Sequence, residues 1–349
     1  MRLEHEILEL RTRHAFNIAR MKGDFVRRTV HVRLIADDGT EGWGEAPVST
    51  PYYGETADTV VAVLPLLQAA LTRAFEEARA ETLPIEVIET VMNGAIGYNR
   101  GAKVAVSAAL HDLLGKRIGE PLWRMWGLDP DSAPRSSYTI GIDEPHLMAQ
   151  RAREAAGFPI LKIKIGTPRD EEMLRAIRDA APDVALKVDA NTAWSVQQAI
   201  DRLPMLEEFG VELLEQPLHP DDLDGFARLR ERSGIPVYAD ESCLLLADVH
   251  RLAGRVDGIN IKLAKCGSLL EAQRMIDAAR EYGMGVMLGC MLETTLGIAA
   301  GVQLAPLVDH LDLDGALLLA EDPIEGPGVE PDGTLRFNQK AGLGVGRRH

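Results

Sequence analysis

The segment "LKIKIG", residues 161–166, alternates like a β-strand but carries two lysines. Because successive side chains of a strand point to opposite faces, Lys162 and Lys164 share one face and the apolar residues share the other. Lysine is almost never fully buried unless it is paired. The segment therefore predicts a strand with one face toward an apolar core and the other toward a polar site.

Similar β-rich runs recur from about residue 135 onward. Segments between them, such as "RDEEMLRAIRDAA" (169–181), repeat apolar residues at intervals of three and four, which is typical of amphipathic helices. The runs begin about 25 residues apart, close to the roughly 30 per strand–helix unit of an eight-fold barrel. They number eight, and no glycine-rich dinucleotide turn follows the first, so we predict a (β/α)8 TIM-type barrel and not an open doubly wound sheet. The runs are "SSYTIGI" (136–142), "ILKIKIG" (160–166), "ALKVDAN" (185–191), "VELLEQP" (211–217), "PVYADES" (236–242), "GINIKLAKCG" (258–267), "GVMLGCM" (285–291) and "HLDLDG" (310–315).

The first 130 residues have a different organisation. The run 27–46 reads as two strands around an Asp-Gly turn, and the segments 55–80 and 101–119 read as helices. We therefore predict an α+β capping domain over residues 1–130 and the barrel domain over 131–319. The tail, about residues 320–349, can return to the cap.

Composition limits the class of partner. The chain has 349 residues, 46% of them hydrophobic, and a formal net charge of −15, which disfavours binding to nucleic acid or anionic membranes. The first ten residues lack the apolar core of a signal peptide, and no run of about 18 apolar residues occurs. Three cysteines without CxxC spacing suggest neither a disulfide framework nor a zinc site. We expect a cytoplasmic protein with a small-molecule substrate.

Acidic residues end three consecutive predicted strands. Asp189, Glu215 and Asp240 occupy these positions, and barrel enzymes place their catalytic groups at the C-terminal strand ends. Converging carboxylates repel one another unless a cation neutralises them, and Mg²⁺ prefers such oxygen ligands. We therefore predict an Mg²⁺ site, with Mn²⁺ as an alternative ion.

The sixth strand ends in "KLAK", with Lys262 and Lys265. In a barrel whose strands follow chain order, the sixth strand lies opposite the second, which carries Lys162 and Lys164. A nearby like charge or a divalent cation lowers a lysine pKa toward the range in which it acts as a base. Lysines on both sides of a carbon next to a carboxylate predict removal of a proton from one face and its return to the other.

Five motifs carry a family resemblance: "KIKIG", "DANTAW", "EQP", "DES" and "KLAKCG", in this order, behind an N-terminal cap. They resemble the enolase superfamily, specifically its muconate lactonizing enzyme subgroup, over essentially the whole chain. The resemblance implies that Asp189, Glu215 and Asp240 bind Mg²⁺, that Lys164 and Lys265 are the acid/base pair, and that Lys162 assists Lys164. The residues expected around them are Asn191, Glu241 and Lys262. Cys266 departs from the common "KTGG" pattern, and we expect it to point away from the metal.

Further residues narrow the expected substrate. Asp312 and Asp314, in "HLDLDG", resemble the signature with which dipeptide epimerases hold a substrate ammonium group. The segment 16–25 resembles the loop that closes such sites, and its Arg20 matches an arginine that contacts a side-chain carboxylate in Ala-Glu epimerases. Glu293, after the seventh strand, would instead favour neutral or cationic side chains. Thr139, on the first strand, is also a predicted substrate contact.

These features predict an Mg²⁺-dependent dipeptide epimerase that inverts the C-terminal residue by two-base 1,1-proton transfer through a metal-stabilised enolate. A cycloisomerase, an o-succinylbenzoate synthase and an N-acylamino acid racemase are alternatives built on the same lysines. Their substrates lack the ammonium group that Asp312 and Asp314 suit. A non-catalytic binding protein is disfavoured because all the lysines and predicted ligands are present. Preferred side chains and a possible homo-oligomer stay open.

Overall fold

The computed structural model describes residues 1–21, 26–48, 54–78 and 84–348. Its larger part is a sheet of eight parallel strands that are hydrogen-bonded in chain order. The main-chain N–H of Ser137 donates to the carbonyl of Leu311 at 3.0 Å, and Ser136 bridges to the same residue, so the first and last strands nearly close a barrel. The predicted barrel is confirmed. Its strands are β4 (Tyr138–Ile140), β5 (Ile160–Lys164), β6 (Ala185–Asp189), β7 (Val211–Glu215), β8 (Val237–Ala239), β9 (Gly258–Lys262), β10 (Gly285–Gly289) and β11 (His310–Asp312).

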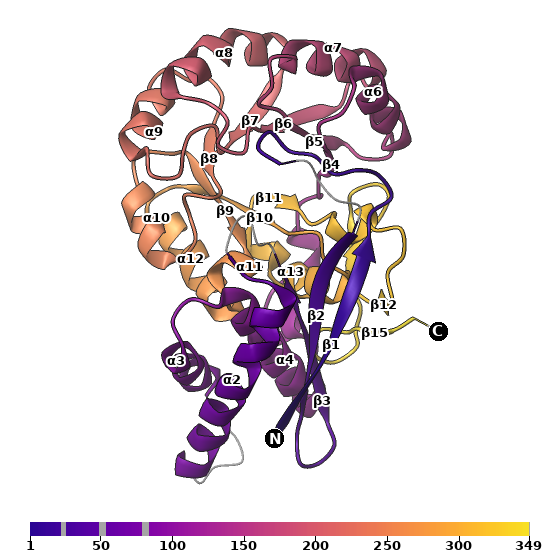
Figure 1. Ribbon diagram of the computed structural model, residues 1–349, viewed down its shortest axis with the longest axis vertical. Helices are drawn as coiled ribbons and strands as arrows, with labels where there is room; N and C mark the ends of the chain where they lie inside the picture. The colour runs from indigo at the N-terminus through magenta and orange to yellow at the C-terminus, as the bar shows by residue number, and fades with distance from the viewer. Residues whose placement is uncertain (22–25, 49–53, 79–83, 349) are drawn as a thin grey trace.

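Helices surround these strands (Figure 1). Their apolar residues face inward at helical spacing; in α7, for example, Met173, Leu174 and Ile177 are buried. Leu161 and Ile163, on the outward face of β5, pack in the same core, as the opening segment predicted. The helices are α6 (Pro145–Glu154), α7 (Asp170–Ala180), α8 (Val196–Glu208), α9 (Leu223–Arg230), α10 (Leu246–Leu252), α11 (Leu263–Cys266), α12 (Leu269–Glu281) and α13 (Thr295–Leu304), with short 3₁₀ turns η1 (Pro130–Ser132), η2 (Ala305–Leu307) and η3 (Gly315–Leu318).

An antiparallel three-stranded sheet forms the N-terminal domain, in the order β1–β2–β3. The predicted hairpin is present, whereas β1 and α3 were not predicted. Most of β1 is exposed on both faces, so it lacks the apolar alternation of a half-buried strand. The elements are β1 (Arg2–Arg11), β2 (Val26–Ile35), β3 (Glu41–Pro47), α2 (Ala57–Ala78), α3 (Ile85–Ala95), α4 (Arg100–Ile118) and α5 (Leu122–Met125).

Helix α4 lies against β3 at very short range. A Cβ atom added to Gly42 would overlap the main-chain oxygen of Ala109, and one added to Gly44 would overlap that of Ala105. Only glycine permits this approach of two backbones. The two glycines of "EGWGEA" therefore set the packing of the cap sheet on its central helix.

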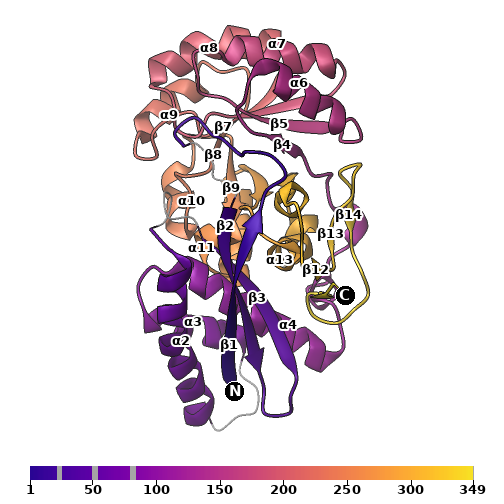
Figure 2. The ribbon, with the colours of Figure 1, turned by 45° about the vertical axis from the view of Figure 1, so that its right-hand side comes forward.

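The C-terminal tail runs beside both domains (Figure 2). Leu343 donates its main-chain N–H to Asp112 of α4 at 2.7 Å, and the same carboxylate accepts from Trp43 of β3 at 2.8 Å. The tail therefore contacts the cap sheet's supporting helix. It contains two small antiparallel pairs, β12 (Ile324–Glu325) with β15 (Gly346–Arg347), and β13 (Gly328–Val329) with β14 (Leu335–Arg336).

Within the described residues, one helix has the length and apolar composition to cross a membrane, over Ala57–Glu77. It is α2, and its inner residues, including Val60, Leu64 and Leu67, are buried in the core of the cap. A long amphipathic core helix meets the same criteria of length and composition.

Candidate active site

Three acidic residues meet at the C-terminal ends of neighbouring strands. Asp189 is the last residue of β6 and pairs in register with Glu215, the last residue of β7; Asp240 directly follows β8. One carboxylate oxygen from each lies within 4.8 Å of the others, and all three side chains are buried. The parallel sheet thus converts three distant positions of the sequence into one cluster.

The charges of this cluster suit a hard cation. Burial raises the pKa of Glu215 to about 7, and the neighbouring charge of Asp189 adds to that rise, although Lys162 opposes it. Asp189 and Asp240 are also buried, but nearby lysines hold their pKa values below the ordinary range. Three closely spaced carboxylates with only oxygen donors match the ligands that Mg²⁺ prefers. The donor set therefore fits the predicted metal.

Lys162 lies fully buried among carboxylates. Its ammonium group is 2.6 Å from Glu215, 2.7 Å from Asp312 and 3.6 Å from Asp189. Burial alone would lower its pKa, but these three acids outweigh burial and raise it well above the ordinary value. The side chain therefore joins a predicted metal ligand to a predicted ammonium ligand.

The pKa of Lys164 is also raised. Burial lowers this pKa, but the carboxylates of Asp189, 2.6 Å away, and of Glu215 together outweigh burial and raise it. Lys162 does lower this pKa, as predicted, yet it is outweighed. The expected lowering by the like charge of Lys162 is therefore present, but the carboxylates beside Lys164 have the opposite and larger effect.

The two lysines of "KLAK" have different surroundings. Strand β9 ends at Lys262, whose ammonium group is 2.7 Å from Asp240. Lys265 lies one turn further, in α11, and its side chain is 1% exposed. It donates to a carboxylate oxygen of Asp240 at 2.6 Å and to the main-chain oxygens of Asp240 and Asn260 at 2.5 and 2.7 Å. Lys265 is therefore fully occupied in holding the end of β8 to β9.

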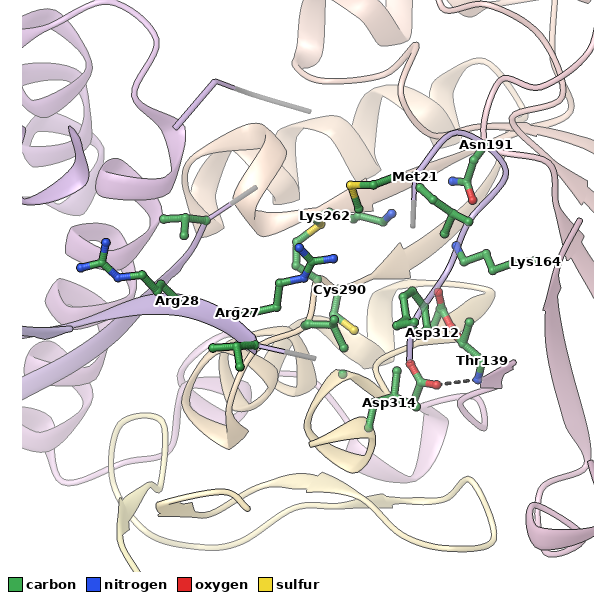
Figure 3. A pocket seen from close by; sticks show the side chains of 18 of the residues that line it. Met21, Arg27, Arg28, Thr139, Lys164, Asn191, Lys262, Cys290, Asp312 and Asp314 are labelled. Atoms are coloured by element: carbon green, nitrogen blue, oxygen red, sulfur yellow. Dashed lines mark hydrogen bonds between the residues drawn. The ribbon is translucent and has the colours of Figure 1, made fainter. Parts of the chain in front are cut away.

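A cavity of about 370 Å³ lies between the barrel mouth and the cap (Figure 3). The ammonium groups of Lys164 and Lys262 point into it from the barrel side. Lys265, Arg20 and Glu293 are absent from the described residues that line it. The predicted site residues that do line it are Thr139, Lys164, Asn191, Lys262, Asp312 and Asp314.

Asp312 and Asp314 border this cavity from β11. Asp312 accepts hydrogen bonds from the hydroxyls of Ser137 and Thr139, each at 3.0 Å. Burial would raise its pKa, but Lys162 and the other nearby lysines together outweigh burial and keep the pKa low. Asp314 accepts from the main-chain N–H of Thr139 at 2.5 Å. Burial and the charge of Asp312 raise the pKa of Asp314 to about 7. The described residues include no cation that forms an ion pair with Asp314, so this carboxylate can receive one from a ligand.

Two predicted substrate contacts lie elsewhere. Arg20 forms an ion pair with Glu241 at 2.5 Å, and Glu241 also accepts from Asn191 at 3.3 Å. The carboxylate of Glu293 accepts from the main-chain N–H of Met291 at 2.9 Å, and burial raises its pKa to about 8. The last part of the predicted closing loop, residues 22–25, is outside the described residues.

Two residues that support the site, Asn260 and Ser137, were not predicted from the sequence. Asn260 donates to Glu215 at 2.8 Å, and Ser137 donates to Asp312 at 3.0 Å. Both lie two positions before a predicted site residue, on the same face of the same chain segment. Period-two spacing from Lys262 and Thr139 would have identified them.

Comparisons with known proteins agree with this geometry. Residues 147–348 match a family described as "Enolase C-terminal domain-like", and residues 7–127 match "Mandelate racemase / muconate lactonizing enzyme, N-terminal domain". The chain belongs to the enolase superfamily. The resemblance inferred from its motifs is confirmed.

Members of this superfamily that resemble the chain include named epimerases. An "L-Ala-D/L-Glu epimerase" of Bacteroides thetaiotaomicron is 39% identical over 97% of this chain and 85% of its own length. A solved dipeptide epimerase from Cytophaga hutchinsonii, complexed with Mg and D-Ala-L-Val, has a TM-score of 0.92 at 31% identity and covers 99% of this chain and 95% of its own. One from Enterococcus faecalis, complexed with Mg and L-Leu-L-Tyr, has a TM-score of 0.89 at 32% identity, with 99% of both chains covered.

Proposed function

We propose that this enzyme is an Mg²⁺-dependent dipeptide epimerase that inverts the α-carbon of the C-terminal residue. The observation that carries the proposal is the arrangement of charge around one cavity. Lys164 and Lys262 line the cavity, and each forms an ion pair with a member of the acidic cluster, Asp189 and Asp240 respectively. Asp314, which follows β11, also lines the cavity. A dipeptide has a carboxylate at one end and an ammonium group at the other, which matches these two regions.

Asp189, Glu215 and Asp240 would hold the metal. Bound there, Mg²⁺ would supply positive charge that stabilises the negative charge developing on a substrate carboxylate when the adjacent carbon loses its proton. The related structures that contain Mg and a dipeptide support this choice of ion and substrate class.

The proton transfers are assigned to Lys164 and Lys262. They come from β5 and β9, which lie opposite each other in the eight-strand order, and both line the cavity. The neutral amine of one lysine takes the α-proton from one face and becomes an ammonium group, and the ammonium group of the other lysine delivers a proton to the opposite face and becomes an amine, which inverts the carbon. We assign this role to Lys262 in place of the predicted Lys265, because Lys265 already donates three hydrogen bonds and does not line the described cavity wall.

Asp314, with Asp312 beside it, is proposed to bind the substrate ammonium group. Lys162 and two hydroxyls orient Asp312, so the cationic end of a ligand meets a carboxylate pair of fixed position. The alternative substrates, which carry an acyl group or a lactone in place of the ammonium, would leave buried Asp314 without a cationic partner.

Proton NMR in D₂O with Mg²⁺ tests the proposal. A pooled L,L-dipeptide library should lose the α-proton signal of its C-terminal residues, gain mass by deuterium and yield L,D-products. Protein that binds Mg²⁺ but exchanges no dipeptide proton would refute the proposed function and favour the cycloisomerase or lyase alternatives.

A further inference from the structure

Glu45, on strand β3 of the cap, has its hydrogen-bond donors in both domains. Its side chain is buried, and its carboxylate accepts from the main-chain N–H groups of Thr294 and Gly297 in the barrel domain, at 3.1 and 3.0 Å. The hydroxyl of Thr294 also donates to it. From the cap, the hydroxyl of Thr29 donates to it at 2.8 Å. The carboxylate therefore joins the cap sheet to the barrel domain.

The donors from the barrel domain belong to the start of helix α13, which lies beside the cap strands (Figure 2). The first N–H groups of a helix have no acceptor within the helix, and a negative charge beside them is stabilising. Thr294 is the N-cap residue, and Asp322 of the tail accepts the N–H of Thr295 at 2.8 Å. Carboxylates from the cap and from the tail thus fix the start of a barrel helix.

The residues just before this helix form part of the cavity wall. Cys290, Met291 and Leu292 line the cavity, and we call them the wall segment; Figure 3 shows Cys290 on this wall. Strand β10 ends at Gly289, so the wall segment and Glu293 are all that separate it from the N-cap residue of α13. Because the segment is short and its two ends are fixed, the position of the helix start determines the shape of the wall.

The contacts of Glu45 require a carboxylate. One of its oxygens accepts from Thr29 and from the N–H of Thr294, and the other accepts from the N–H of Gly297. Burial would raise the pKa of Glu45, but His31 and the hydrogen bonds from Thr294 outweigh burial and lower it. A glutamine has the same size, but its NH₂ group is a donor and would face another donor in either orientation. A buried donor without an acceptor is costly.

We propose that Glu45 is a positioning residue of the enzyme: by holding the start of α13 across the domain boundary, it keeps the wall segment in the shape that receives the substrate. Glu45 is absent from the described residues that line the cavity, so it acts through the wall segment and not by contact with the ligand. This inference rests on the proposed dipeptide epimerase activity and adds to it a residue of the cap.

Alkylation of the Cys290 thiol by iodoacetamide reports on the wall segment without turnover. Glu45→Gln should raise its rate by about fivefold or more, because a segment that has lost its support opens more often. Mass spectrometry of peptides measures the rate, and the buried Cys243 is the internal reference for opening of the whole fold. Glu41→Gln is the matched control, because Glu41 begins the same strand and accepts from Trp43 within the cap. It should keep the wild-type rate.

Steady-state kinetics test the effect on the substrate. With a dipeptide that the wild type epimerises, Glu45→Gln should raise KM by about tenfold or more and change kcat by about threefold or less. The Mg²⁺ affinity should stay at the wild-type value. A purely structural role would lower the unfolding temperature and leave KM unchanged at temperatures where the variant is folded. If Glu45→Gln does not fold, Thr294→Val removes one hydrogen bond of the same carboxylate and should raise both KM and the alkylation rate by about twofold or more.

The outcomes separate this inference from the proposed function. Wild-type KM and wild-type alkylation of Cys290 in the folded variant overturn the positioning role of Glu45. Faster alkylation with an unchanged KM overturns its role in the reaction. If the wild type epimerises no dipeptide, the proposed function fails, and the alkylation rates still decide whether Glu45 holds the wall segment.

Discussion

Lys265 and Lys262 contact different oxygens of the same carboxylate. The ammonium group of Lys265 lies 2.6 Å from one carboxylate oxygen of Asp240, and that of Lys262 lies 2.7 Å from the other. The two lysines are three residues apart in the sequence, yet only Lys262 lines the described wall of the cavity. Lys262 therefore faces the cavity of the proposed reaction, and Lys265 contacts a predicted metal ligand from outside that cavity wall.

Separate replacement of these lysines should give different defects. Lys262→Ala and Lys164→Ala should each lower kcat for epimerisation by about 10²–10⁴-fold, the usual contribution of a general acid or base. Each should still exchange the α-proton of one substrate epimer in D₂O, because one base survives. Lys265→Ala should mainly weaken Mg²⁺ binding. Calorimetric Mg²⁺ titration beside the exchange assay distinguishes these defects; normal epimerisation by Lys262→Ala would refute its assignment.

Removing one acid of the cluster should abolish tight Mg²⁺ binding. Glu215→Gln keeps the size of the side chain but removes a charged oxygen donor, so we expect the Mg²⁺ affinity to fall by about 100-fold or more. Glu212→Gln is the matched control, because Glu212 lies on the same strand with its side chain exposed. Titration calorimetry measures both variants, and equal affinities would remove Glu215 from the metal site.

Asp314→Asn should weaken binding of dipeptides with a free ammonium group. Loss of its charge removes an ionic partner, so we expect KM for a free dipeptide to rise by roughly tenfold or more. The KM for the N-acetylated dipeptide, which has no ammonium group, should change little. Equal changes in KM for the two substrates would show that Asp314 does not recognise the ammonium group.

The close approach of β3 and α4 predicts a sharp effect on stability. Gly44→Ala should lower the free energy of unfolding by about 1–3 kcal/mol or more, because its methyl group would overlap the backbone of α4. Gly94→Ala is the control: this glycine lies in helix α3 and has open space around it, so the change should be neutral or slightly stabilising. Thermal unfolding of both variants checks this, and equal midpoints would contradict the packing argument.

Glu293 should make stability depend on pH. Burial, assisted by Glu45, raises its pKa from 4.5 to about 8, so between these values the folded carboxyl keeps a proton that the unfolded one has lost. This group therefore lowers the free energy of unfolding as pH rises through that window, by at most about 1.4 kcal/mol per pH unit.

Glu293→Gln removes this titration and keeps an oxygen that can accept from Met291. The stability of the variant relative to the wild type should therefore rise between pH 5 and pH 8. Chemical denaturation at fixed Mg²⁺ concentration measures both proteins, and other titrating groups cancel in the comparison. Parallel stability curves would mean that Glu293 is ionised in the fold.

Much of the fold was predictable because its signals are local and repeated. Eight apolar runs alternating with amphipathic segments require a parallel sheet covered by helices, and the barrel follows from their number. Strand β1 was missed because an exposed edge strand buries too little apolar surface to show alternation. The short helix α11 was missed because a single turn has no period to read.

By itself, the sequence determined that a barrel carries carboxylates and lysines on its strand ends, since parallel strands bring their C-terminal ends to one rim. It did not determine which of Lys262 and Lys265 meets the cavity, because that depends on where β9 ends and the chain turns into α11. Nor did it determine that Arg20 is absent from the described residues that line the cavity. Glu241, more than 200 positions away from Arg20 in the chain, pairs with that arginine, and such an ion pair exists only after the cap and the barrel have come together.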